Sequence, residues 1–202
     1  MKLKVVIIII FLFQTVAIPE EHSKTIKKIR DNYLCINAAA NYFQVNPLIL
    51  ASIIYTERTL NYDWTDEVFD IALAKLGLNS SIGFCQIKIK TAFFVEVQIT
   101  DSNRVYFPGF KFCSSIRVSR SVEELINKLA VDSINIFYAA AYLRIIQSYW
   151  QRKGFFIDNY PEILGSLYQV GLFYPDGKER KPRWNPQPNH FGLLVKEAVL
   201  NF

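Results

Sequence analysis

The stretch Asn46-Pro-Leu-Ile-Leu-Ala-Ser-Ile-Ile-Tyr-Thr-Glu57 (NPLILASIIYTE) combines a helix start, an apolar stripe and a terminal carboxyl group. Asn46 can cap a helix and Pro47 suits the first helical position, so the pair predicts a helix start. Apolar side chains then recur at helical spacing, and Glu57 ends this stripe of Leu50, Ile53 and Ile54. The pattern therefore predicts a helix through Glu57 that holds a carboxyl group against the core.

The position of Glu57 has a chemical consequence. A carboxyl group held against apolar side chains loses hydration in its charged form, which raises its pKa. A raised carboxyl pKa is what a general acid needs at neutral pH. The alternative is a helix-end glutamate that reaches solvent or pairs with Arg58, and the helix alone leaves both interpretations open.

Four short sequence motifs lie one after another between residues 40 and 171. They are Ala40–Glu57, Ser80–Ile87 (SSIGFCQI) with Thr91-Ala92, Asn135-Ile136 with Tyr142-Leu143, and Leu167–Gly171 (LYQVG). Together they resemble the motifs of the lysozyme-like superfamily of soluble lytic transglycosylases and goose-type lysozymes. The resemblance implies a mainly α fold of the α+β lysozyme type, with a helical lobe and a small irregular or β segment around residues 77–120.

The resemblance also implies a role for particular residues. Glu57 matches the catalytic acid of the superfamily, and Tyr168 matches the tyrosine that hydrogen-bonds it. Gly83 matches the glycine that lets the backbone approach the sugar, and Gln86 matches a glutamine that lines the cleft. The substrate-binding residues expected on this basis are Ser81, Gly83, Gln86, Tyr168 and Gln169.

Structural interpretations of the same residues remain open at this point. Gly83 can simply form a turn, and Gln86 can be a solvent-facing strand residue. Tyr168 follows apolar positions of a predicted helix, so it can equally be a core side chain.

The chain also departs from the motifs of the superfamily. Arg58 stands where serine is common, Gln169 replaces asparagine, and Phe84-Cys85 replaces Leu-Met. These departures keep open a catalytically inactive glycan-binding or envelope structural module on the same scaffold, since fold alone does not determine function. A third possibility is an envelope protein that docks a partner through the loop Tyr174–Asn189.

The number of catalytic carboxyl groups bears on the reaction. Most glycosidases use two, and the acidic residues that follow Glu57 closely fall in no motif: Asp63, Asp66, Glu67 and Asp70. The resembled transglycosylases use one glutamate, which protonates the glycosidic oxygen and then takes a proton from the C6 hydroxyl to close an anhydro ring. We therefore expect Glu57 to act as general acid and base on the MurNAc-GlcNAc β-1,4 bond of peptidoglycan, with transglycosylase and hydrolase outcomes both open.

The N-terminal segment has the layout of a secretory signal. Lys2 and Lys4 precede the apolar run Val5–Phe13, and Thr15-Val16-Ala17 offers a cleavage site. We expect residues 1–17 to be a signal peptide and 18–202 a single exported domain, periplasmic or secreted. The alternative is that this segment stays uncleaved and anchors the protein. Only in that case do we expect the chain to contact a membrane. Removal of the two lysines lowers the net charge from +5 to +3 (21 basic minus 18 acidic residues), which suits an anionic cell wall.

Composition narrows the remaining classes of protein. Half of the residues are apolar (51%), which argues against disorder. The chain has three cysteines, no C-x-x-C pair and two histidines, so no metal or other cofactor is expected. Cys85 and Cys113 can form a disulfide, or all three cysteines can be small buried hydrophobes. The expected partner is the glycan strand of peptidoglycan and not a nucleic acid, and the expected state is a monomer.

Further helices follow from caps and periodicity. We expect helices from Ser23 to about Tyr42, from Thr65 or Asp66 to Leu76, from a capping box at Ser121 to about Trp150 with a break near Asp132, from Pro161 to Val170, and from Phe191 to Leu200. We expect loops and a small hairpin in 77–120, where runs such as Val95–Thr100 are rich in β-branched residues.

Overall fold

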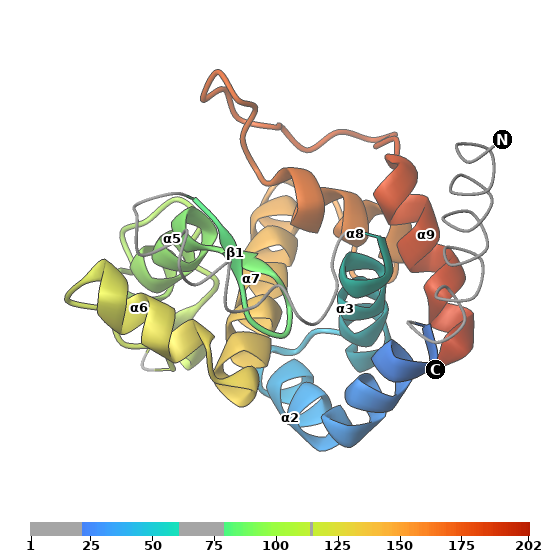
Figure 1. Ribbon diagram of the computed structural model, residues 1–202. Coiled ribbons are helices and arrows are strands. Elements are labelled where there is room, and N and C mark those ends of the chain that lie inside the picture. Colours follow the sequence, from blue (N-terminus) through green and yellow to red (C-terminus); the bar gives the residue numbers. More distant parts are fainter. Residues whose placement is uncertain (1–21, 61–78, 114) are drawn as a thin grey trace, which may run out of the picture.

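A computed structural model describes residues 22–60, 79–113 and 115–202 of the chain. These residues form a mainly helical structure with one two-stranded hairpin, which confirms the predicted fold class (Figure 1). Its elements are α2 (Tyr33–Phe43), α3 (Pro47–Leu60), β1 (Ser81–Ile82), β2 (Ile87–Lys88), α5 (Ile89–Thr100), η1 (Phe110–Phe112), α6 (Val122–Leu129), α7 (Asp132–Arg152), α8 (Pro161–Val170), α9 (His190–Ala198) and η2 (Val199–Asn201).

Helix α7 is the central element of the fold. It contacts α5, α6 and β2 on one side and α2 and α8 on the other, so it joins two groups of helices (Figure 1). The run Ala139-Ala140-Ala141 in its middle is fully buried, because small side chains let neighbouring helices approach closely. The second group, α2, α3, α8 and α9, is held together mainly by contacts of α9 with α8 and α3.

Helix α3 forms as its sequence predicts. The Asn46 side-chain oxygen accepts hydrogen bonds from the backbone N–H groups of Leu48 (2.9 Å) and Ile49 (3.4 Å), which caps the helix start. Ile53 and Ile54 are fully buried. Since the helix continues to Leu60, Glu57 lies in its last turn.

The predicted helix from Ser23 to Tyr42 is interrupted in the structure. Residues 22–31 are helical, Asn32 forms a turn, and α2 begins at Tyr33. The backbone N–H and the side-chain amide of Asn32 both donate to the carbonyl of Lys28, at 3.2 and 3.1 Å. An asparagine side chain that binds a nearby carbonyl in this way competes with regular helical pairing.

Within the described residues, the other predicted breaks and helices agree with the structure. The Ser121 hydroxyl accepts from the N–H of Glu124 (3.1 Å), and the axis bends by 102° between α6 and α7 at the break expected near Asp132. Helices α8 and α9 occupy their predicted positions, and Tyr174–Asn189 is irregular.

The segment 77–120 holds the predicted hairpin but also a helix that was not predicted. In the hairpin, Ser81 pairs with Lys88 and Ile82 with Ile87. The next twelve residues, Ile89–Thr100, form α5 although they are rich in β-branched and aromatic side chains. Its buried side chains lie at helical spacing toward α6 and α7, so packing overrides their strand propensity.

Of the two alternatives for the cysteines, the Cys85–Cys113 disulfide does not form, because all three cysteines are free thiols, and only Cys85 is a buried side chain. Cys85 is fully buried ahead of α5, whereas the Cys113 thiol donates to the carbonyl of Thr100 at the end of that helix.

The thiols provide a first prediction. Burial raises the pKa of the Cys85 thiol well above its ordinary value, so this thiol stays protonated and inaccessible at about pH 8. Ellman's reagent should label at most Cys35 and Cys113 in the native protein, and all three cysteines after denaturation without reductant. Rapid labelling of Cys85 in the native protein, or fewer than three thiols after denaturation, would contradict this arrangement.

Several predictions concern residues outside those that the structure describes. They are the signal segment 1–17, the helix Thr65–Leu76, and the acidic residues Asp63, Asp66, Glu67 and Asp70. Within the described ranges, no single helix is both long and apolar enough to cross a membrane, and only the bent pair α6–α7 meets these criteria when taken together.

Candidate functional site

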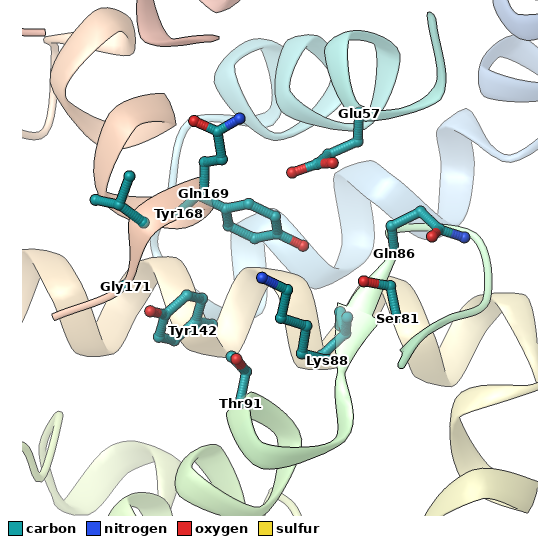
Figure 2. Close-up of a pocket in the computed structure, with 11 residues that line it drawn as sticks. Glu57, Ser81, Gln86, Lys88, Thr91, Tyr142, Tyr168, Gln169 and Gly171 are labelled. Atoms are coloured by element: carbon teal, nitrogen blue, oxygen red, sulfur yellow. The ribbon is translucent and has the colours of Figure 1, made fainter. Parts of the chain in front are cut away.

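A pocket of about 300 Å³ lies between α3, the hairpin, α7 and the C-terminal end of α8. Its lining includes four of the residues expected to bind substrate, together with Glu57 (Figure 2). The lining residues are Glu57, Ser81, Gln86, Ile87, Lys88, Thr91, Tyr142, Tyr168, Gln169, Val170 and Gly171.

Glu57 points into this pocket from the last turn of α3, toward the phenol of Tyr168 (Figure 2). Its side chain is only 9% exposed, as its place on the apolar stripe predicts. It is the one carboxyl group among the described residues that line the pocket, and Lys88 is the one cation among them. A shielded carboxyl group at the wall of a pocket is suited to exchange a proton with a bound molecule.

Arg58, a departure from the superfamily motif, holds the hairpin beside Glu57. Arg58 is 2% exposed, and its guanidinium donates to the carbonyl oxygens of Phe84 (3.0 Å) and Gly83 (2.5 Å). Consecutive residues at the end of α3 thus supply the pocket carboxyl group and anchor the turn of the hairpin. Arg58 therefore helps to position the site through the hairpin.

Asn135, at the start of α7, fixes the hairpin from the other side. Its amide nitrogen donates to the carbonyls of Ile82 and Leu129, both at 2.8 Å, and its oxygen accepts from the N–H of Cys85 at 2.7 Å. The side chain is fully buried and all three bonds are internal. The Asn-Ile segment therefore contributes to the site through the position of the hairpin.

Gly83 does not line the pocket, which corrects its expected role as a sugar-approach glycine. Its backbone has φ of +73°, and a Cβ at this position would lie 2.2 Å from the Leu129 carbonyl oxygen and 2.4 Å from the Asn135 side chain. The glycine is needed because the hairpin turn packs directly on the α6–α7 junction. Of the two interpretations of Gly83, sugar-binding residue or turn residue, the structure agrees with the turn residue.

Gln86 lies at the end of the hairpin turn with a left-handed backbone (φ +52°). Its side-chain nitrogen donates to the carbonyl of Gly83 at 3.2 Å, and the residue is 6% exposed. Its side-chain oxygen is buried and has no hydrogen-bond donor among the described residues. Figure 2 shows the amide turned away from Glu57 and Tyr168, so Gln86 lines the pocket without presenting this oxygen to it.

Tyr168 lines the pocket, but its hydroxyl bonds a different group from the expected one. It donates its single proton to the carbonyl of Cys85 at 3.0 Å, and so not to the carboxylate of Glu57. Tyr168 therefore connects α8 to the hairpin. Burial raises the pKa of its hydroxyl well above 10.0, with smaller contributions from the nearby Cys85 and Glu57.

The pH dependence of stability follows from this shift. The neutral phenol is favoured in the folded state, so its contribution is present below the unfolded pKa and is lost as pH rises through the folded value. Tyr168→Phe should lower stability by about 1 kcal/mol at neutral pH. Urea unfolding should show wild-type stability falling above about pH 10, and falling less steeply in the variant. If the stability of both proteins falls equally steeply with pH, the raised pKa of the Tyr168 phenol is contradicted.

Ser81 and Gln169 also line the pocket, as expected. The Gln169 oxygen accepts from the side-chain amide of Asn189 at 2.8 Å, which ties the end of α8 to the start of α9. Lys88, at the end of β2, is a lining residue that the sequence motifs did not indicate.

No group of three or more His, Cys, Asp or Glu side chains in the described part of the chain is placed to hold a metal ion. Comparison of the sequence with protein-family models found no match, and a search of curated proteins found none either. Function is therefore inferred from the residues of the site and from their chemistry.

Proposed function

We propose that this chain cleaves the β-1,4 glycosidic bonds of peptidoglycan glycan strands, with Glu57 as the proton donor. The observation that carries the proposal is a glutamate only 9% exposed that lines a 300 Å³ pocket among groups suited to bind sugars. Pockets of this size or larger with a few convergent polar groups are typical of small-molecule sites.

The reaction needs one carboxyl group to act twice. Protonated Glu57 donates to the glycosidic oxygen as the bond to the anomeric carbon breaks, and the leaving sugar departs as an alcohol. The resulting carboxylate then takes the proton of the C6 hydroxyl, whose oxygen bonds the anomeric carbon and closes an anhydro ring. If a water molecule attacks the anomeric carbon in place of that hydroxyl, the carboxylate takes a proton from the water and the product is a hydrolysed strand.

The rest of the pocket supports binding of such a ligand. Lys88 reaches across the pocket below Tyr168 (Figure 2), and its ammonium group can attract the carboxylates that peptidoglycan carries. The Ser81 hydroxyl, which lines the same pocket, can bond a sugar hydroxyl or an N-acetyl amide. Both groups come from the hairpin that Arg58 and Asn135 hold in place.

Digestion of purified peptidoglycan by the full chain tests the proposal. We expect soluble fragments that are lighter by one water than ordinary reducing products when they are weighed by mass spectrometry. Fragments with ordinary reducing ends would show that the enzyme hydrolyses the bond and forms no anhydro ring. Glycan binding without release of any fragment would contradict the proposed cleavage activity and favour an inactive glycan-binding module.

A further inference from the structure

A second and larger pocket, of about 510 Å³, lies at the opposite end of α8 from Glu57. Its walls are the turn that follows α7, the first residues of α8 and the proline-rich part of the loop before α9. We term it the Trp184 groove and define it by Phe155, Phe156, Tyr160, Arg183, Trp184 and Gln187.

Exposed aromatic rings dominate the Trp184 groove. Trp184 is 87% exposed, Phe156 66% and Tyr160 52%. The Trp184 ring meets Phe155 edge-on, with centroids 5.0 Å apart and an interplanar angle of 68°, so a contact with its neighbour holds this exposed ring. Exposed rings gathered in one pocket are a mark of a binding surface.

Polar groups beside these rings narrow the class of ligand. Arg183 and Gln187 line the same pocket and offer hydrogen-bond donors and an acceptor. A sugar ring has a face of C–H groups, which packs on an aromatic ring, and a rim of hydroxyl groups, which bonds such side chains. The combination therefore fits a carbohydrate.

A bridging pocket of about 200 Å³ lies along α8 between the Trp184 groove and the Glu57 pocket. It shares Val170 with the Glu57 pocket, and it shares Ile163, Arg183, Pro186 and Gln187 with the Trp184 groove. The three hollows thus follow α8 from end to end, over about 15 Å for a helix of ten residues. A path of this length suits a polymer of several sugars.

The charges of the bridging pocket favour an anionic glycan there. Arg180, Lys181 and Arg183 line it, with no acidic side chain among the described lining residues, which suits the carboxylates of peptidoglycan.

We propose that a glycan strand bound at Glu57 continues along α8 and places a more distant sugar against Trp184. The inference rests on the proposed function for the identity of the polymer. The Trp184 groove then selects long strands, because a short oligosaccharide cannot occupy both ends of α8.

Binding to the Glu57→Gln protein, which is not expected to cleave its ligand, tests this inference. Calorimetry would compare a β-1,4-linked N-acetylglucosamine hexamer with the dimer. Trp184→Ala in this background should weaken hexamer binding roughly tenfold and leave dimer binding unchanged. Phe110→Ala is the matched control, because Phe110 is 78% exposed, meets Phe107 edge-on and lies outside the three hollows.

The outcomes separate this inference from the proposed function. Equal hexamer affinity in the Trp184→Ala and Phe110→Ala proteins would overturn the inference even if the wild type cleaves peptidoglycan. Selective weakening by Trp184→Ala would support it even if the wild type releases no fragments. Binding of sugar-free stem peptides that depends on Trp184, with no hexamer binding, would make the groove a peptide site and also overturn the inference.

Discussion

Glu57→Gln is expected to lower the rate of peptidoglycan cleavage by about 10²- to 10⁴-fold, the range typical of a positioned general acid. Glutamine keeps the size of the side chain and its place in the last turn of α3, but it cannot donate the proton that the leaving oxygen needs. The 9% exposure of Glu57 means that solvent is poorly placed to supply that proton. Initial rates of fragment release from purified cell wall measure the effect.

The control for this variant is Glu123→Gln, which removes an exposed carboxyl group from the first turn of α6. Its rate should stay within about twofold of wild type, since surface substitutions have small effects. Glu57→Gln should also fold normally and bind the sugar hexamer with little change. A Glu57→Gln protein that keeps full activity would remove Glu57 from the mechanism.

The second large effect is expected at Gly83. Gly83→Ala should lower the free energy of unfolding by about 3 to 5 kcal/mol, because the new Cβ meets a backbone oxygen and the Asn135 side chain. The hairpin would have to leave α7, and with it Gln86 and Lys88 would leave the pocket. Activity should therefore fall even where the variant remains folded. Urea unfolding and cleavage rates measure the two effects.

Gly154→Ala separates the clash from backbone strain. Gly154 also has a positive φ (+86°), but a Cβ there meets nothing within 4 Å. Only the cost of a left-handed backbone remains, about 1 to 2 kcal/mol. If the two alanine variants are equally destabilised, the close approach of the hairpin to the α6–α7 junction is not what requires glycine at position 83.

Local signals in the sequence were enough to predict much of the fold. The cap at Asn46, the stripe that ends at Glu57 and the capping box at Ser121 each involve residues within one or two turns, so periodicity and capping rules identify them. The predicted burial of Glu57 follows from the same rules, because an apolar stripe must face the core.

Long-range packing explains what the sequence did not indicate. Ile89–Thr100 has the composition of a strand, and it forms α5 because its apolar face packs on α6 and α7. Gly83 matched a sugar-binding motif, yet the contact that requires glycine involves Asn135, more than fifty positions away. Likewise the proton of Tyr168 is directed to Cys85, a contact that becomes visible only when α8 lies beside the hairpin.

The role of Glu57 as proton donor can be tested by a structure of Glu57→Gln bound to a glycan tetramer. We expect a glycosidic oxygen within hydrogen-bonding reach of the residue 57 side chain, at about 3 Å, with the Ser81 side chain on an adjacent sugar. A tetramer bound elsewhere, with the pocket between α3 and the hairpin left empty, would contradict it.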